Sequence, residues 1–516
     1  MQNIAQLFQN ALPGGAAALG GSMGGDMGQF EELTKALQAG DINGGYTTDV
    51  RNLQGGGALG VQSLDTAMKT TVQENKHFTL FNMLQQTSAI NIVDEYSRQS
   101  SVGGFLGGST NTQMGVVRAA QGEYSREVGM VKFLMSLRQV GYVLNIGKNI
   151  AEPIAVEERN GALQLLTDAN YLLYHGNAAV VGTQFDGIFT QIDAEIAAKK
   201  MSPDARVDLD GKPLNTVEQL SLINVEASSY GNWGRSTDIF LPNSVQNDLN
   251  MSLDPAYRWV PEGQNTPLLG GHVQGIRLTS GILKTNMDTF IHDETNPMVH
   301  VFELTNANLA AKNDSDGLKV NTVAAAAKTA VSGSKFSTSR AGAYVYAVAA
   351  VSKSGAGYSK AKIVDATTVA AGGSIELTIT NPASGDLGGF AIYRGRQDVA
   401  KSTGATADID TLRDLRLVKV IPANTSGSTV FVDDNTTIPG TVCVPQLNLE
   451  AGADAIGWRQ FQPMTKIPLP FGVGGMPVMS WFQFLFGYLR ITKPKHHGYI
   501  KNVLPTQAKW RPHTGE

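Results

Sequence analysis

A single long amphipathic helix, predicted at Ile154–His175, is the feature that most limits the folds open to this chain. Pro153 precedes it, where proline suits the first turn of a helix, and Gly176 follows it, where glycine often ends one. Extended segments lie on both sides of the helix, so the section 146–317 has an α+β pattern. It also contains predicted helices at Gln191–Lys200 and Val217–Ser228, a helix opening at Asn243–Asn250 and a short buried strand at Asp238–Pro242.

A long glycine-rich segment between two extended arms occupies much of residues 61–145. Val93–Arg98 begins the first arm, and Val131–Arg138 alternates in the manner of a strand. Glycine adopts backbone conformations that other residues avoid, so the centre can bend. The pattern predicts a protruding hairpin, whose centre contains Gly103, Gly104, Gly107, Gly108, Gly115 and Gly122.

Residues 1–60 combine two short helical patterns with glycine-rich patches. Such a segment cannot bury enough apolar surface to fold alone. The sequence therefore predicts a flexible amino-terminal arm. Two alternatives stay open: the arm orders on a neighbour, or it is removed by proteolysis.

Composition changes again near residue 318, where short strands follow one another without a long helix. Turn residues separate the strands, which is typical of a β-sandwich. We place this sandwich at 318–442, inserted into the α+β body. Residues 443–516 are too few and too apolar to form a further domain, so we expect them to return to that body. The predicted sandwich strands are Tyr344–Val351, Ile375–Thr380, Phe390–Tyr393, Leu417–Ile421 and Thr429–Val432.

Length and charge narrow the class of protein. A chain of 516 residues is expected to form two to four domains. Its 41 Lys and Arg oppose 45 Asp and Glu, so no global basic field exists to hold nucleic acid. The single Cys443 excludes an intramolecular disulfide and a paired-cysteine metal site, which fits a reducing compartment. No secretory signal is visible, and the apolar run Val478–Ile491 is too short to cross a membrane, so we expect a soluble intracellular protein.

No catalytic signature is present: the sequence contains no phosphate-binding P-loop, no GxSxG nucleophile turn and no HExxH metal helix. Asp208 and Asp210 precede Gly211 as in a calcium loop, but Arg206 and Val217 occupy positions where calcium needs oxygen ligands. A polar turn is expected there instead. We therefore predict no catalytic, cofactor-binding or metal-binding residues, and a protein that is not an enzyme.

Two groups of residues contain histidine beside charged side chains. His292, Asp293 and Glu294 are adjacent, which is not metal-ligand spacing, so they predict a solvated turn. His496 and His497 lie among lysines and predict a basic strand edge that resists aggregation, with nucleic-acid contact as the alternative.

The order of these parts resembles the major capsid proteins of tailed bacteriophages, which have the Hong Kong 97 phage capsid fold. Phe185–Ile188, after the helix, also resembles family members. The family forms hexamers and pentamers, and it sometimes joins subunits through a lysine–asparagine bond; Lys132 lies in the hairpin region but no partner is identifiable. The resemblance assigns Asp94–Tyr142 to the extended loop, Ile154–His175 to the spine helix, Asn177 to about Leu304 with part of 443–475 to the axial domain, and Phe482–Lys493 with His497–Val503 to the closing strands of the peripheral sheet.

The inserted sandwich is similar to immunoglobulin-like or fibronectin type III domains at Gly342–Val351, Phe390–Arg394 and Phe431–Asp434. Such modules occur as insertions on the outside of phage capsid proteins. Deleting 318–442 is therefore expected to spare the shell, whereas deleting about Ser97–Arg126 is expected to prevent its assembly.

The resemblance implies a structural protein that assembles with copies of itself into the icosahedral head shell of a tailed phage. The shell encloses double-stranded DNA without sequence-specific binding. Implied partners are a portal and possible scaffold or decoration proteins, with no cofactor and no membrane. The protein would reside in the virion after assembly in the host cytoplasm. The alternatives are an encapsulin-like compartment that packages enzymes, an exported adhesin built on the sandwich, and an enzyme whose site the sequence does not reveal.

Overall fold

The computed structural model describes residues 41–42, 45–46, 78–146, 152–252, 275–291, 318–329, 331–355, 357–402, 407–472 and 476–514. The chain divides into two compact units, Met1–Thr70 and Thr71–Glu516. In the first unit, β1 (Asp41–Ile42) and β2 (Gly45–Tyr46) form an antiparallel pair. Most of the predicted arm, and the group His292–Glu294, lie outside the described residues.

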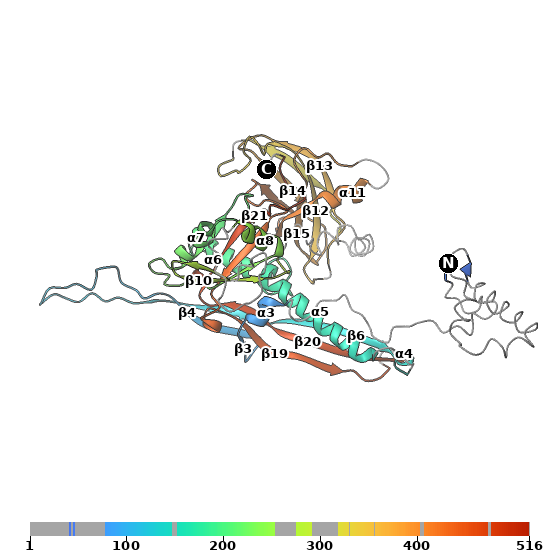
Figure 1. Ribbon diagram of the computed structural model, residues 1–516, viewed down its shortest axis with the longest axis horizontal. Coiled ribbons are helices and arrows are strands. Elements are labelled where there is room, and N and C mark those ends of the chain that lie inside the picture. The colour runs from blue at the N-terminus through green and yellow to red at the C-terminus, as the bar shows by residue number, and fades with distance from the viewer. Residues whose placement is uncertain are drawn as a thin grey trace, which may run out of the picture. The chain divides into compact units, whose positions relative to one another are not determined.

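A four-stranded sheet and one long helix form the first part of the second unit (Figure 1). The helix α5 (Pro153–His175) confirms the predicted one, with the proline in its first turn. It packs so closely that a Cβ at Gly161 would lie 1.8 Å from Oε1 of Gln483 on the sheet. The sheet order is β3 (Gln86–Ser88), β19 (Ile456–Pro468), β20 (Val478–Ile491) and β6 (Lys132–Gly141), with the short helices α3 (Thr79–Met83) and α4 (Tyr142–Ile146) beside it.

A six-stranded mixed sheet forms the second part of the body. It carries three predicted helices: α6 (Ile188–Ala197), which begins three residues before the predicted start, α7 (Val217–Ala227) and α8 (Asn243–Ser252). The buried strand predicted at Asp238–Pro242 is confirmed as β8. The sheet order is β7 (Arg206–Asp208), β21 (Gly498–Val503), β18 (Val442–Leu447), β8 (Asp238–Leu241), β10 (Gly281–Met287) and β9 (Gly275–Leu278).

The position of β21 corrects two sequence predictions. The strand lies between β7 and β18, so His497–Val503 does not close the sheet that contains β20. Nor is it a basic edge: His497 is 1% exposed, and its Nδ1 accepts a hydrogen bond from the backbone N–H of Asn448 at 3.0 Å. Burial lowers the pKa of His497 to about 3, so the ring is neutral. Alternation along a short strand indicates burial, but it does not identify the neighbouring strand.

The hairpin is shorter than the sequence predicts. Its arms are β4 (Val93–Ser101) and β5 (Glu123–Met130), which pair only with each other. The stretch Val131–Arg138, predicted as the return arm, belongs mainly to β6 and pairs with β20. Val131 is buried and ends the hairpin. The residues that follow it belong to β6, which pairs with β20, a strand some 350 positions later in the sequence.

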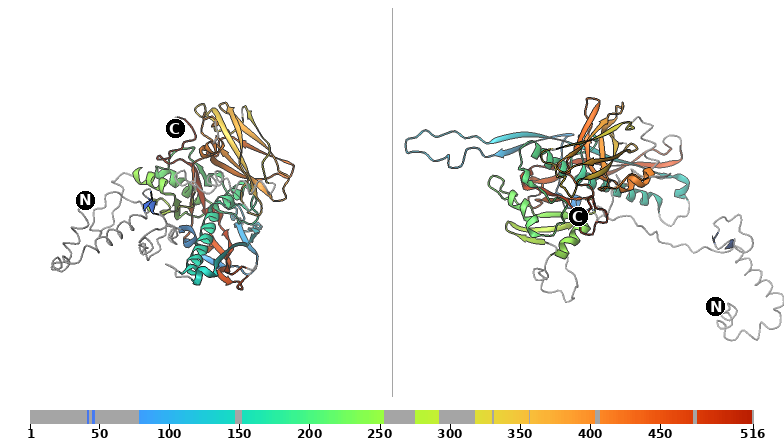
Figure 2. Two further views of the ribbon diagram at one scale, coloured as in Figure 1. Left: turned by 90° about the vertical axis from the view of Figure 1, so that its right-hand side faces the viewer. Right: turned by 90° about the horizontal axis from the view of Figure 1, so that it is seen from above.

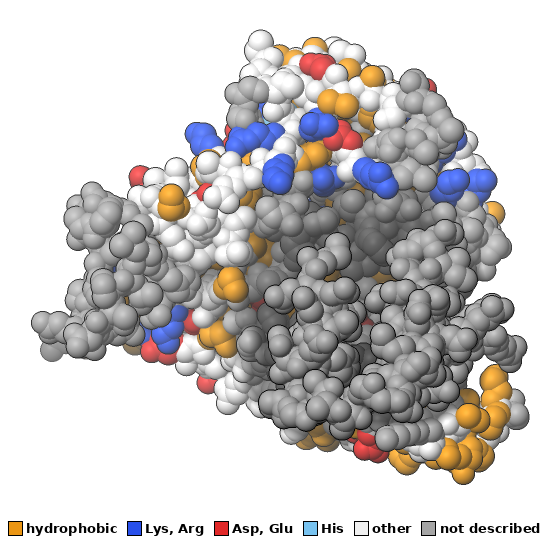
Figure 3. Space-filling view, turned by 45° about the vertical axis from the view of Figure 1, so that its right-hand side comes forward, with side chains coloured by type: hydrophobic (Ala, Val, Ile, Leu, Met, Phe, Trp, Pro, Cys, Tyr) orange, Lys and Arg blue, Asp and Glu red, His pale blue; other side chains and the backbone are white. Residues whose placement is uncertain are grey.

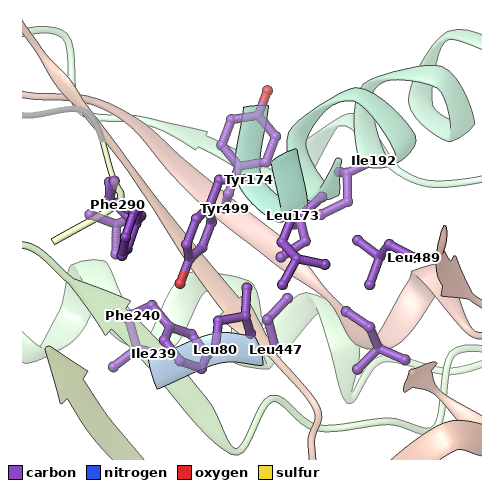
Figure 4. Packing of buried hydrophobic residues seen from close by; sticks show 14 of the residues in the cluster. Leu80, Leu173, Tyr174, Ile192, Ile239, Phe240, Phe290, Leu447, Leu489 and Tyr499 are labelled. Carbon is purple, nitrogen blue, oxygen red and sulfur yellow. The ribbon is translucent and has the colours of Figure 1, made fainter. Parts of the chain in front are cut away.

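One apolar core joins the two sheets of the body (Figure 4). Side chains from α3, α5, α6, α7 and α8 and from strands of both sheets meet in it, including Leu80, Leu173, Ile192, Phe240 and Leu489. The carboxylate of Asp288, 1% exposed, lies within this core. It accepts hydrogen bonds from four groups: Tyr174 Oη at 2.8 Å, the Phe290 N–H at 2.9 Å, the Leu80 N–H at 3.3 Å and Asn170 Nδ2 at 3.4 Å.

Replacing Asp288 with alanine is expected to destabilise the body by about 3–5 kcal/mol, because four buried donors lose their acceptor. Asp288→Asn keeps one acceptor oxygen and is expected to cost about 1–2 kcal/mol. Urea unfolding followed by tryptophan fluorescence measures both losses of stability; equal losses would contradict the role of the acceptor.

Burial raises the pKa of Asp288 despite its hydrogen bonds. The wild-type protein should therefore lose stability as pH rises from about 4 through that raised pKa, and Asp288→Asn should not.

Residues 318–442 contain a β-sandwich of two sheets. All five predicted strands are present, together with β11, β13 and the short helix α11 (Ala407–Asp414). Tyr346, Val348, Ile375, Leu377 and Phe390 fill the space between the sheets. One sheet is β11 (Val323–Lys328), β14 (Ser374–Thr380) and β17 (Ser428–Asp433), and the other is β13 (Lys362–Val369), β12 (Gly342–Ser352), β15 (Leu387–Arg394) and β16 (Arg416–Pro422).

The sandwich packs against the body over an apolar surface. Val180 and Val181, from the loop after α5, are buried in a cluster with Val345 and Tyr393 of the sandwich. The approach is close, since a Cβ at Gly388 would lie 2.0 Å from the Val180 carbonyl oxygen. Deleting 318–442 alone would expose the apolar side chains of Val180 and Val181. The deletion that the sequence predicts to spare the shell therefore needs polar substitutions at these two positions.

The last described residues also contact the sandwich, although the sequence predicts a return to the body. Trp510 is 5% exposed, and its Nε1 donates to the Asp414 carbonyl at 2.8 Å. His513 is 3% exposed, with Nδ1 3.1 Å from the hydroxyl of Tyr344. The tail therefore runs from β21 of the body onto the sandwich, and links them a second time.

Candidate assembly surfaces

The tip of the hairpin presents apolar side chains to solvent. Gly103 fixes its entry, because φ is +84° and a Cβ would lie 2.0 Å from the Gln121 carbonyl oxygen. Arg118 lies over the ring of Phe105, 5.8 Å from its centroid. Exposed apolar residues of this kind, close together, mark contact surfaces. They are Val102 (68%), Phe105 (64%), Leu106 (78%), Met114 (98%), Val116 (92%) and Val117 (82%).

The root of the hairpin is attached to the body by charged groups on one face of β4. Asp94 accepts hydrogen bonds from Arg459 Nε at 2.8 Å and Tyr488 Oη at 2.6 Å, and Arg490 lies 3.6 Å away. Burial alone would raise the pKa of Asp94, but the hydrogen bonds and the two arginine charges hold it below its usual value. The backbone passes close to this group, since a Cβ at Gly129 would lie 2.2 Å from the Tyr488 ring.

A second ion-pair group lies further along the hairpin. Arg98 contacts Glu195 of α6 at 3.0 Å and Glu127 of β5 at 3.1 Å, and Lys200 contacts Glu127 at 3.0 Å. Burial would raise the pKa of Glu127, but Lys200, Ser125 and Arg98 together lower it. Two separated ionic contacts therefore fix the direction in which the hairpin leaves the body, seen from two sides in Figure 2.

Sequence reasoning missed both root groups. Arg459 and Tyr488 are more than 360 residues from Asp94, so no local pattern connects them. The available signal was the alternation of Asp94, Tyr96 and Arg98, which places three polar side chains on one face of a strand.

Replacing Asp94 with asparagine is expected to weaken the root by about 2 kcal/mol, because two partly buried arginines lose their counter-ion. Hydrogen exchange of the β4 and β5 amides measures the loss. The control is Glu95→Gln: its partner Arg126 is 74% exposed, so less than about 1 kcal/mol is expected. Equal effects of the two variants would show that Asp94 does not fix the hairpin. In the wild-type protein, the pKa of Asp94 is lower when the protein is folded, so its carboxylate stabilises the root at neutral pH. This stabilisation is lost only as the pH falls below about 4.

The outward face of the four-stranded sheet carries an apolar stripe. Phe133, Met135 and Leu137 of β6 lie opposite Phe486, Phe484 and Phe482 of β20. The rings of Phe133 and Phe486 meet edge to face at 4.9 Å, and Phe484 stacks on Phe486 at 4.9 Å. Phe133, Met135 and Leu137 are 46%, 64% and 50% exposed. This face lies opposite the residues that contact α5, so the described chain leaves it partly open.

A further apolar cluster lies at the end of the same sheet. Tyr142 and Phe471 meet edge to face, with ring centroids 5.2 Å apart. Hydrophobic side chains gather at the lower right of Figure 3. The exposed members of the cluster are Tyr142 (41%), Val143 (78%), Leu144 (55%), Ile146 (66%), Phe471 (59%) and Met476 (61%).

The predicted polar turn at Asp208–Gly211 joins the body to the sandwich. Asp208 contacts Lys335 of the sandwich at 2.5 Å and Lys501 of β21 at 3.3 Å. Burial would raise the pKa of Asp208, but these partners and Asn502 lower it to about 2. Arg340 donates to the Asp210 carboxylate at 2.6 Å. Lysine and arginine side chains therefore pair with both carboxylates of this turn.

Chemically reactive groups are sparse among the described residues. No three histidine, cysteine or acidic side chains within them are placed to hold a metal ion. Burial raises the pKa of the Cys443 thiol to about 12. No helix in the described ranges is long and apolar enough to cross a membrane; α5 itself contains four charged side chains.

Comparison with known proteins adds relatives of the whole chain. No protein-family model matches. The major capsid proteins of Staphylococcus phages S25-3 and S25-4 are each 22% identical over 490 residues, which cover 92% of this chain and 96% of theirs.

Several solved structures align along most of the chain at low similarity. The capsid of a native GTA particle aligns at 7% identity and a TM-score of 0.43, covering 89% of this chain and all of the other. Mycobacterium phage Adephagia aligns at 7% and 0.38, covering 86% and 96%, and the SrpI encapsulin of Synechococcus elongatus at 9% and 0.35, covering 86% and 93%.

The sequence relatives span both chains almost completely, so the relationship includes the hairpin, the body and the sandwich region together. Both relatives are named as major capsid proteins. With its α+β body, this chain is therefore similar along almost its whole length to the major capsid proteins of these two phages.

Proposed function

We propose that many copies of this chain form the icosahedral head shell of a tailed phage, in hexamers and pentamers, around double-stranded DNA. The observation that carries the proposal is the anchored hairpin with its exposed apolar tip. A monomeric protein gains nothing from an arm held rigidly at its root and apolar at its end. An interlocking shell does, because lapping arms enlarge the interface of each subunit.

The apolar stripe of β6 and β20 supports the same proposal. The tip needs an apolar surface on a neighbouring copy, and the stripe supplies one on each copy. A tip and a stripe on one chain make a head-to-tail contact, which propagates from copy to copy. Closed particles require such contacts to repeat.

The shell is proposed to enclose DNA without gripping it. A formal charge of -4 gives the chain no global attraction for phosphate, so packaging falls to other components such as a portal and its motor. We propose assembly in the host cytoplasm, with possible scaffold or decoration proteins as partners. The proposed divisions are the arm 1–60, the hairpin region 61–145, the body 146–317, the sandwich 318–442 and the return 443–516.

We propose that the sandwich is an immunoglobulin-like insertion displayed outside the shell. Its two sheets and separate core support this. The matched test is deletion of 318–442 together with Val180→Ser, Val181→Ser and truncation after Leu504. Shells are expected from this variant; soluble subunits that never form shells would show that the sandwich is integral to assembly.

Negative-stain electron microscopy of the purified protein, alone and co-expressed with neighbouring genes, tests the main proposal. Uniform icosahedral particles with nuclease-protected DNA after co-expression are expected. Particles that retain protein cargo and no DNA would favour the encapsulin-like compartment. Subunits that stay monomeric under both conditions would overturn the proposal.

A further inference from the structure

Two exposed aromatic rings lie on the loop between α7 and β8. Tyr230 is 73% exposed and Trp233 is 65% exposed. Their rings meet edge to face, with centroids 5.7 Å apart. Among the four tryptophans within the described residues, the other three, Trp458, Trp481 and Trp510, are at most 5% exposed. Trp233 is therefore exposed to solvent, whereas the other described tryptophans are buried.

The loop holds the rings in a fixed position. Asn232 Nδ2 donates to the Glu226 carbonyl at 3.0 Å and to Ser229 Oγ at 2.9 Å. The Gly234 N–H donates to the Ala227 carbonyl at 2.8 Å, and His496 Nε2 donates to the Asn232 carbonyl at 3.0 Å. Gly234 must lack a side chain, because a Cβ would lie 2.2 Å from the His496 ring. Such a preorganised loop loses little conformational entropy when it binds.

The backbone at Trp233 is strained. Its φ is +47°, in the left-handed region that bulky residues avoid. Strain of this kind persists where the position of a side chain matters for function. Two further exposed residues, Leu222 (45%) and Val225 (62%), lie three positions apart on α7 and extend the apolar surface. Arg235 and Glu450, paired with each other and half exposed, provide a charged margin.

The size of this surface indicates its partner. Two aromatic side chains bury about 150–250 Å² each, whereas a stable two-protein complex needs about 800 Å² from each partner. The patch is too small to hold a separate protein by itself. It suits a contact that acts beside other contacts between the same two molecules, where each added contact is nearly intramolecular. Copies of this chain in a shell meet that condition, because the hairpin already joins them.

We propose that Tyr230 and Trp233 form a contact with a second copy of this chain within the shell. The proposal rests on the shell-forming function above. Tyrosine and tryptophan are the residues that most often dominate the affinity of an interface. The loop adds a rigid apolar contact on the six-stranded sheet, separate from the flexible tip of the hairpin.

The test uses the full chain with Tyr230→Ser and Trp233→Gly combined. Glycine accepts the positive φ, so the free subunit should keep its Tm within about 2 °C, while shell yield falls at least tenfold. The control is Val430→Thr with Val432→Thr, two residues of the sandwich that are 52% and 43% exposed. Normal shells are expected from the control.

Acrylamide quenching of fluorescence provides a second measurement, with Trp233→Phe as the blank. Trp233 should be quenched in free subunits and protected in shells. Wild-type shell yield from the double variant, or a Trp233 that stays equally quenchable in shells, would overturn the proposal and leave the patch to another partner. Absence of shells from the wild-type chain would instead overturn the proposed function, and this contact with it.

Discussion

Replacing Val102–Gly122 by a two-residue Asn-Gly turn should abolish shell formation and leave a folded subunit. The paired arms β4 and β5 and both ion-pair groups at the root stay in place, and Asn-Gly suits a tight hairpin. What is lost is six exposed apolar side chains, each of which contributes about 1.5–3 kcal/mol when it is fully buried. Loss of several such contacts at every subunit interface is more than a shell can tolerate.

Electron microscopy and sedimentation measure the result, and circular dichroism confirms the fold. A second variant keeps the length of the tip and changes its polarity: Met114→Gln, Val116→Thr and Val117→Thr. Reduced yield from this variant would assign the contact to apolar burial rather than to reach. Normal shells from the shortened hairpin would remove the main support for the proposed function.

The buried ion pair of the sandwich should be the most sensitive point of that domain. Arg394 and Asp433 are 0% and 2% exposed, with NH1 and Oδ2 2.6 Å apart. Tyr346 Oη also donates to Asp433 at 2.7 Å, and the Arg394 guanidinium lies over the rings of Phe336 and Tyr344. Arg394→Met leaves the carboxylate buried without a counter-charge, which typically costs about 3–5 kcal/mol.

Hydrogen exchange of the β12 and β15 amides measures this loss without assuming that the whole chain unfolds in one step. Arg396→Met is the control, since that neighbouring arginine is 44% exposed where it pairs with Asp414, and less than about 1 kcal/mol is expected. A loss equal to that of the control would contradict a structural role for the pair.

Local pattern predicted the elements well. The helix at α5 was visible because proline, helical spacing and glycine all lie within 24 residues. The five sandwich strands were visible because alternation and turns are also local. The sequence missed β11 and β13: four of the six residues of β11 are alanine, and β13 mixes polar residues on both faces.

Pairing and docking could not be predicted in this way. β6 alternates like a hairpin arm, yet its partner is β20, about 350 residues away. The root contacts of Asp94 and the strained loop at Trp233 likewise depend on residues that are distant in the chain or on a backbone angle that composition does not encode.

The sequence by itself determined the long helix, five strands of the sandwich and the order of the parts. Through that order it determined the resemblance to phage capsid proteins. Tertiary structure alone decided that the hairpin ends at Met130, that β21 lies inside the six-stranded sheet and that the tail packs on the sandwich. The physical reason is the distance along the chain over which each effect acts. Periodicity and turn chemistry depend on a few neighbouring residues, whereas strand register and burial depend on segments that meet only when the chain folds.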